Sequence, residues 1–481
     1  MSATAPYPNS STRPYDLPPL AGLGSIEAAL QAGLSVEESV RRLKRHHYVL
    51  RRLHHVLLAR LTAEPIYELK MAFSLHAHYC AEHVAAIRSR VSEMREPPYG
   101  LEDIPHPALP RLFDELLNAP TTTELLLGIY QVVLPAVQRG LQAHYDACHL
   151  MADAPTRRLL RFALLEVGDM VAWGQAVVTG FISPEQHQTA AAFVQTLNAL
   201  VTAAGDLDGT AESTATLPAP VYADRPYTYD RVPRRDERFS DPYNMGVNAE
   251  AFLYDEAKPA DAKVLMMYYK RLREIDVPEM MASIIVETAD KPWDFYRDMT
   301  RQLWDEARHA MLGEIGFASL GVDWPRHVMV NFTWSLELNT RLTAQERHGV
   351  LYFIEQGLMP RTGKRFEWET SVQAQDPLAA TIQDFDWADE VLHARIGREW
   401  YVSQWPNAQA AIRYGDESWS RILGSWASWR DQGLTQHRNW WPDLYRAYCA
   451  TRGQEPDAAV LAFETTYEAV RADLQALTGS A

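Results

Sequence analysis

The amino-acid sequence predicts an all-α protein in which two helical domains are joined by an irregular segment. Apolar residues recur at helical spacing between residues 26 and 205 and again from residue 263, and no stretch shows the strict alternation of a β-strand. Residues 206–262 have no persistent period and are rich in Pro, Asp, Tyr and Gly, which is typical of a linker or wrapping segment. The length of 481 residues also favours at least two domains, because a single hydrophobic core stops growing at roughly 250–300 residues.

The N-terminal part combines an arm with a helical domain. Residues 1–25 are rich in Pro, Ser and Gly and are expected to form a flexible arm. In the domain at 26–205, Ser35 is a suitable N-cap for the first long helix. The helices expected in this domain lie at about 40–61, 65–95, 107–118, 122–151, 154–179 and 183–204. The arginines between residues 41 and 52 predict a solvated face or a subunit contact, with a binding patch for an acidic ligand as the alternative.

Helical periodicity resumes at Asp261 and continues toward the C-terminus. The domain at 263–405 is expected to contain four long helices, at about 261–289, 292–320, 325–358 and 377–402. Pro292 and Pro377 each follow an acidic residue closely, which suits the start of a helix. Residues 406–481 predict a helical extension whose tryptophans are expected in a core or an interface.

Charge and cysteine content restrict the class of protein. Lys and Arg number 46 against 62 Asp and Glu, and the net charge of −16 argues against general binding to nucleic acid or to an anionic membrane. The three cysteines are far apart and lack metal-finger spacing, which indicates a reducing compartment. The first residues do not read as a secretion signal, and no uninterrupted apolar run approaches the about 20 residues of a spanning helix. We therefore expect a cytoplasmic protein without a membrane partner.

Two copies of one motif carry the chemistry. Both copies read Asp-Glu-x-x-His-Ala-x-x-Gly, and they begin at Asp305 and at Asp389. On a helix, residues i and i+3 share a face, so each copy aims a carboxylate and an imidazole in the same direction. Two such helices facing each other can hold metal ions. The candidate ligands in the two copies are Glu306, His309, Glu390 and His393.

Each copy also has a glutamate at about the same height on the preceding predicted helix. A four-helix di-metal carboxylate site takes a Glu from each of two helices and a Glu-x-x-His from each of the other two. Glu355 lies 35 residues before Glu390, and Glu274 lies 32 residues before Glu306, so a turn midway brings each pair level. Glu279 is the alternative to Glu274, because the proline before it can distort the helix and shift the register.

Together the predicted ligands offer four carboxylates and two neutral imidazoles. Such a set suits two Fe(II) or Mn(II) ions that keep open positions for dioxygen. Glu306 and Glu390 are the expected bridging ligands, and Asp305 and Asp389 are the expected acceptors for the imidazole nitrogens that do not bind metal. Two alternatives stay open here: surface helices that carry Glu and His at this spacing by accident, and a pseudo-site that has lost a ligand.

On these residues the chain resembles the ferritin-like superfamily of di-iron carboxylate proteins. The resemblance is confined mainly to residues 263–402, and it rests on Glu274, Glu306, His309, Glu355, Glu390 and His393. It implies a ferritin-like four-helix bundle that binds two iron ions, with an Fe/Mn or Mn centre as the alternative. The N-terminal helical domain is interpreted as a degenerate ferritin-like domain without a metal site. A separate site there is the alternative, with candidate ligands at His76, Glu82, His83 and Glu166.

The resemblance and the ligand set predict a non-haem di-iron oxidase or oxygenase that activates dioxygen to oxidise a small organic substrate. Rubrerythrin-like peroxide reduction is one alternative, and a non-catalytic iron-binding or structural role is the other. An electron donor and a second copy in a homodimer are further expected partners. Aromatic residues near the ligands are candidates for electron relay or simply for the core, namely Tyr268, Tyr269, Trp304, Tyr352 and Trp387.

Overall fold

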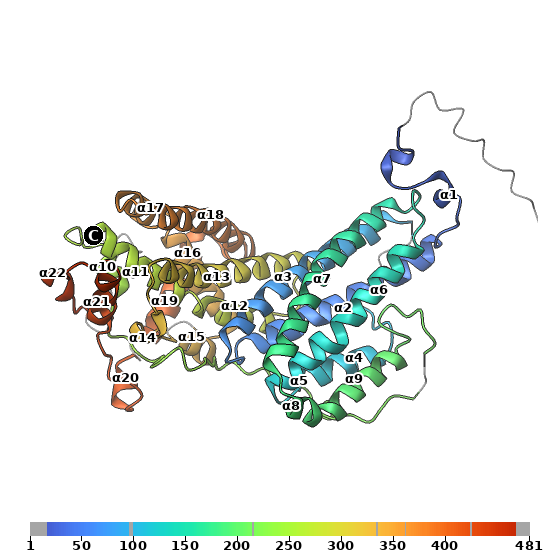
Figure 1. Ribbon diagram of the computed structural model, residues 1–481, viewed down its shortest axis with the longest axis horizontal. Coiled ribbons are helices and arrows are strands. Elements are labelled where there is room, and N and C mark those ends of the chain that lie inside the picture. The colour runs from blue at the N-terminus through green and yellow to red at the C-terminus, as the bar shows by residue number, and fades with distance from the viewer. Residues whose placement is uncertain are drawn as a thin grey trace, which may run out of the picture. The chain divides into compact units, whose positions relative to one another are not determined.

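In the computed structural model, all regular secondary structure in the described residues is helical (Figure 1). The structure describes residues 17–95, 100–213, 216–332, 335–360, 362–423 and 426–467, and these contain no β-strand. The predicted all-α fold class is therefore confirmed. Residues 1–16 of the predicted arm and residues 468–481 of the predicted C-terminal extension lie outside the described residues.

The chain divides into two compact units whose boundaries differ from those expected from the sequence. One unit takes the chain up to Leu50 together with Ala86–Asp224, and the other takes Arg51–Ala85 together with the chain from Arg225 onward. The segment Arg51–Ala85 was expected in the N-terminal domain. It joins the second unit because its side chains pack there, as when Trp293 donates its indole N–H to the Ala81 carbonyl at 3.0 Å.

The first unit is a set of helices with clear start signals. Thr121 and Ser183 each cap a helix by accepting a backbone N–H, and Ser183 forms a full capping box with Gln186. The helices that lie wholly in this unit are α1 (Ile26–Ala29), α4 (Ala108–Leu117), α5 (Thr122–Leu126), α6 (Leu134–Ala147), α7 (Ala154–Phe181), α8 (Pro184–Thr189) and α9 (Ala191–Ala203). Helices α2 (Val36–Leu61) and α3 (Tyr67–Glu93) are shared between the two units. The helix expected at 122–151 contains a π-helical stretch, Leu127–Val133.

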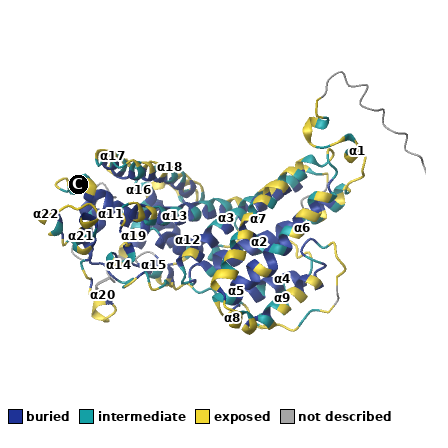
Figure 2. Ribbon diagram, viewed as in Figure 1, coloured by how far each residue is buried: buried dark blue, intermediate teal, exposed yellow. Residues whose placement is uncertain are grey.

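Helix α7 is the most apolar long helix of the described chain. By length and composition it could cross a membrane, although only 28% of its most apolar window is buried. Figure 2 shows exposed positions along this helix, and Phe162 and Leu165 are among them. Among the described residues this is the one helix that length and composition would allow to cross a membrane, and a single such helix is weak evidence for a membrane span.

The second unit contains the helices that carry both motifs. They are α10 (Ala249–Leu253), α11 (Ala260–Arg273), α12 (Asp276–Glu287), α13 (Trp293–Ser319), α14 (Trp324–His327), α15 (Ser335–Arg341), α16 (Ala344–Gly357), α17 (Lys364–Gln373), α18 (Pro377–Trp400), α19 (Ala408–Leu423), α20 (Trp426–Asp431), α21 (Trp441–Thr451) and α22 (Ala458–Leu461). Helix α13 packs against α11, α12 and α18, while α16 packs against α12 and α18 (Figure 1). These helices therefore form a bundle, in which α11 and α12 together take the place of one long helix beside α13, α16 and α18.

Two of the expected long helices are interrupted. The helix expected at 261–289 ends at Arg273 and restarts at Asp276, so that Glu274 lies in the break. The helix expected at 325–358 falls into three pieces because a capping box between Thr343 and Glu346 starts α16 inside that stretch. Helix α17 was not expected at all. The starts predicted at the two prolines agree with α13 and α18.

Two tryptophans of the C-terminal extension, Trp440 and Trp441, belong to the core of the second unit. Trp440 packs on Tyr269 with ring centroids 4.3 Å apart, and Trp441 packs on Phe252 at the same separation. Both tryptophans are almost completely buried, and together with α11 and α13 they form one hydrophobic cluster. The extension therefore supports the face of the bundle that α11 presents.

Candidate metal centre

The two motifs face each other inside the bundle. Glu306 and His309 project from α13, and Glu390 and His393 project from α18, which packs on α13. All four side chains are at most 2% exposed. Burial of bare carboxylates is costly unless they are paired or coordinated, so this arrangement needs positive charge within it.

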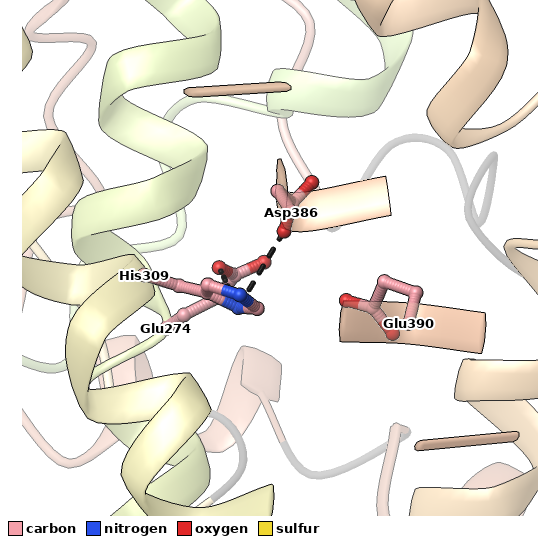
Figure 3. A group of neighbouring side chains, drawn as sticks. All are labelled: Glu274, His309, Asp386 and Glu390. Atoms are coloured by element: carbon pink, nitrogen blue, oxygen red, sulfur yellow. Dashed lines mark ion pairs between the residues drawn. The ribbon is translucent and has the colours of Figure 1, made fainter. Parts of the chain in front are cut away.

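One group of ligand atoms surrounds the first histidine and is called the His309 group below. The Nδ1 atom of His309 lies 3.5 Å from Glu274 Oε2 and 3.5 Å from Asp386 Oδ1, as the dashed lines in Figure 3 mark. Glu390 lies across from the ring and completes the group (Figure 3). One ligand atom from each of these four residues lies within 4.8 Å of the other three.

A second group surrounds the other histidine and is called the His393 group. The Nδ1 atom of His393 lies 3.1 Å from Glu306 Oε1 and 3.5 Å from Glu390 Oε2. Glu355, from α16, is the fourth member, and its Oε1 accepts a hydrogen bond of 3.1 Å from Gln302. All four members are buried. Glu390 belongs to both groups, and Glu306 also reaches the His309 ring at 3.5 Å.

The structure brings all six predicted ligands into these two groups. Glu279, the alternative to Glu274, points elsewhere and pairs with Lys70 at 2.9 Å and with Arg235 at 3.0 Å. It lies in α12, beyond the break at Glu274, and this break turns it away from the centre. Of the two glutamates only Glu274 is therefore in a position to bind metal.

The alternative site considered for the N-terminal helical domain is not among the groups that could hold a metal ion in the described residues. Glu82 pairs with Arg297 at 2.8 Å, and burial lowers the pKa of His76 to about 3, so this imidazole is neutral inside the protein. Among the described residues, the only groups able to hold an ion are the two in the bundle.

Asp386 is a member of the centre that the sequence reasoning missed. It precedes Glu390 by four residues on α18, and it is completely buried. Residues four apart share a helix face, so the spacing from Asp386 through Glu390 to His393 was a signal that could have been found.

Two buried cations that the sequence did not indicate border the His309 group. Lys364 begins α17, and its Nζ lies 2.9 Å from Asp386 Oδ2 and 2.9 Å from Glu390 Oε1. Arg271, near the end of α11, pairs with Glu274 at 3.0 Å and also contacts Asp386. Lys364 escaped prediction because no helix was expected between residues 358 and 377.

The outer nitrogens of the two imidazoles are held crosswise. His309 Nε2 lies 3.1 Å from Asp389 of the second motif, and His393 Nε2 lies 3.4 Å from Asp305 of the first. A carboxylate can only accept, so in both rings Nε2 carries a hydrogen, and Nδ1 is the nitrogen that a metal ion would take once its own proton is released. Arg308 bridges the two aspartates, at 2.8 Å from Asp389.

The inner atoms have no hydrogen-bond partner in this arrangement. The buried atoms left without one include Glu274 Oε2, Glu306 Oε1, Glu390 Oε2 and the Nδ1 atoms of both histidines. Lone pairs that face one another at this distance repel unless a proton or a cation lies between them. The orphaned oxygens and nitrogens are hard and borderline donors, and they fit divalent iron or manganese.

The pKa values of the buried histidines and of Glu355 also indicate that the centre needs positive charge. Burial disfavours protonation of His309, but Asp386, Asp389 and neighbouring glutamates outweigh it and raise its pKa well above the ordinary value. The pKa of His393 is raised for the same reasons. Burial, reinforced by Glu390 and Glu306, raises the pKa of Glu355 well above its usual range. Metal binding would therefore release protons from these groups.

The glycine that ends the first motif lets the helices approach. A Cβ atom at Gly313 would lie 2.3 Å from the Leu272 backbone nitrogen and 2.6 Å from the Tyr268 carbonyl oxygen. Only glycine allows α13 to pack this closely on α11, the helix that ends beside Glu274. At Gly397, in the second motif, the added atom would meet the Tyr352 ring at 2.4 Å.

Two of the aromatic residues considered for electron relay, Tyr268 and Tyr269, are core residues. Tyr268 and Tyr269 are almost completely buried in the cluster that includes Trp440, and their hydroxyls reach Asp376 at 3.3 Å and the Met329 carbonyl at 3.2 Å. Packing accounts for their positions.

Comparison with known proteins found no match to this chain among protein-family models, curated proteins or solved structures.

Proposed function

We propose that this protein is a cytoplasmic non-haem di-iron oxidase or oxygenase of the ferritin-like type that uses dioxygen to oxidise a small organic substrate. The observation that supports it most is the pair of adjoining groups that share Glu390, with unpartnered oxygens and Nδ1 atoms directed inward. Structural ion-pair networks normally satisfy such atoms, whereas metal sites leave them to the ion.

The donor set is the basis for choosing iron. Five carboxylates and two imidazoles converge, and no cysteine takes part, which suits Fe(II), or Mn(II) and mixed Fe/Mn as the alternatives. Two ferrous ions, when bound, supply the electrons and the open positions that dioxygen reduction requires. The protein's own part is to orient the imidazoles through Asp305 and Asp389 and to keep water from the buried centre.

An electron donor separate from this chain is part of the proposal. The chain has three cysteines, Cys80, Cys148 and Cys449, which are buried and far apart in the sequence, so they cannot together form the four-cysteine iron site that often serves rubrerythrin-like proteins. Peroxide reduction and a purely structural metal site are the alternatives to be separated by experiment. We further propose that the protein acts as a homodimer.

Dioxygen consumption by the ferrous protein tests the function. Iron-loaded protein is mixed anaerobically with candidate substrates and then with dioxygen, and consumption is followed with an electrode. We expect consumption in the wild type and none in His309→Ala or His393→Ala. Bound iron without consumption would support a structural role instead, and consumption retained in either variant would show that the ligand set is wrong.

The peroxide alternative is separated by the same preparation. Rapid turnover of hydrogen peroxide with little reaction toward dioxygen would favour rubrerythrin-like chemistry, whereas an oxidase or oxygenase reacts with dioxygen from the ferrous state.

A further inference from the structure

Lys364 places a buried positive charge beside the carboxylates of the centre. Its side chain is completely buried, and its Nζ lies 3.0 Å and 2.9 Å from the two oxygens of Asp386, 2.9 Å from Glu390 Oε1 and 3.8 Å from Glu274 Oε1. These three residues are all the carboxylates of the His309 group. The Lys364 ammonium group therefore pairs with carboxylate oxygens of Asp386, Glu390 and Glu274 that are candidate ligands of a metal ion.

The two groups are unequal in charge. The His309 group holds three carboxylates and is bordered by two cations, Lys364 and Arg271. The His393 group also holds three carboxylates, but within the described chain neither Glu306 nor Glu355 pairs with a lysine or arginine. A divalent ion in the His309 group therefore competes with two side-chain cations that cannot be removed by loss of a proton from a carboxyl group or an imidazole, whereas an ion in the His393 group competes directly only at the shared Glu390.

We propose that Lys364 holds the place of the second cation, so that the centre fills in order: the His393 group binds the first divalent ion, and the His309 group accepts one only after the Lys364 ammonium leaves Asp386 and Glu390. This inference rests on the proposed function, because it assumes that the centre binds divalent ions.

The position of Lys364 allows it to leave. It is the first residue of α17, and a cation at a helix N-terminus is the charge that the helix dipole disfavours, so the carboxylates hold it there rather than its own helix. Its four-carbon chain can rotate without moving the backbone. Arg271 is held more firmly, since it lies within α11 and contacts Glu274, Glu367 and Asp386 at once.

The order of filling has a functional consequence. Reduction of dioxygen by a di-iron centre draws on both ferrous ions, so a centre with one ion and Lys364 in place cannot complete it. Lys364 is thereby a positioning residue that keeps a half-filled centre from reacting.

Titration of the full-length protein with Mn(II) tests the inference, with calorimetry and electron paramagnetic resonance as readouts. In the wild type we expect the first ion to bind at least about tenfold more tightly than the second. The spectrum should show isolated Mn(II) up to one equivalent and a spin-coupled pair only beyond it. Lys364→Met should strengthen binding of the second ion by about tenfold or more, and coupled pairs should then appear below one equivalent.

Two further variants keep the result interpretable. Lys364→Arg retains the charge and should retain the gap between the two affinities. Lys70→Met is the matched control, because it removes another buried lysine from a buried carboxylate, Glu279, that lies outside both groups, and it should leave the gap unchanged. Circular dichroism establishes that each variant is folded, and the wild-type titration decides the order of filling without any variant.

The outcomes separate this inference from the function on which it rests. Two ions of equal affinity in the wild type would overturn the ordered filling, and an unchanged gap in folded Lys364→Met would overturn the role given to Lys364. Either result would leave the proposed function standing. No Mn(II) binding by the wild type would overturn both.

Discussion

The Nε2 atom of His309 donates a hydrogen bond to Asp389 at 3.1 Å, although the histidine belongs to the first motif and the aspartate to the second. The reverse pair, His393 and Asp305, is held in the same way at 3.4 Å. Each motif therefore provides ligands of its own and the support for the other motif's imidazole. This relationship explains why both copies begin with aspartate directly before the glutamate, and it makes the two motifs one unit.

Asp389→Asn tests this crosswise support. Asparagine keeps the shape but can donate as well as accept, so Nε2 is no longer compelled to carry the hydrogen. We expect the affinity for Mn(II) to fall by about 10- to 100-fold while the protein stays folded. Asp384→Asn, an exposed position on the same helix, is the control and should bind as the wild type does. Unchanged affinity in Asp389→Asn would contradict the role given to this aspartate.

The choice of Glu274 over Glu279 predicts opposite behaviour of two neighbouring variants. Glu274→Ala should weaken Mn(II) binding and have the smaller effect on stability, because its side chain is partly exposed. Glu279→Ala should leave metal binding intact but destabilise the fold by about 3–5 kcal/mol, since Lys70 and Arg235 would remain buried without their carboxylate. Urea unfolding and metal titration of both variants check this. A loss of metal binding in folded Glu279→Ala would reverse the choice.

A buried histidine outside the centre predicts a dependence of stability on pH. Burial lowers the pKa of His54 to about 3, and its Nε2 lies 2.8 Å from the Thr300 hydroxyl. The unfolded chain takes up this proton near pH 6.5 and the folded protein does not, so the contribution of His54 is complete above pH 6.5 and is lost as the pH falls toward 3. When the pH is lowered from 7 to 5.5, the free energy of unfolding should fall in both metal-free proteins, and the fall should be about 1 kcal/mol smaller in His54→Gln than in the wild type. Identical pH slopes for the two proteins would refute this.

Removal of metal should lower the stability of the second unit. An ion present at 100 times its dissociation constant stabilises the folded state by about 2.7 kcal/mol. We therefore expect a chelator to reduce the thermal midpoint of the wild type by several degrees. The double variant His309→Ala, His393→Ala provides the reference, because it should show the same midpoint with and without chelator. A chelator effect of equal size in the double variant would place the stabilising ion elsewhere.

The sequence allowed the prediction of those features that depend on local periodicity. The i, i+3 spacing of Glu306 with His309 and of Glu390 with His393 sets which residues share a face, and the distance to Glu355 sets its height on the preceding helix. Helix starts at Pro292 and Pro377 were readable for the same reason, since capping is a local property.

Features that depend on tertiary packing were not accessible. Arg51–Ala85 reads as helix whichever core it joins. The break at Glu274, by contrast, had a local signal in Pro278, which cannot donate to the carbonyl four residues before it. Lys364 enters the centre from α17, a helix that was not expected, and its role is defined only by the carboxylates around it. Asp386 could have been predicted from its position four residues before Glu390, but it lies outside the Glu-x-x-His motif.

Iron stoichiometry after anaerobic loading is the most direct test of the central claim. Purified full-length protein is saturated with Fe(II), freed of excess iron by gel filtration, and measured by elemental analysis against protein concentration. The account predicts two iron ions per chain in the wild type and a loss of bound iron in His309→Ala and His393→Ala. Fewer than about one iron per chain in the wild type would contradict the di-metal centre.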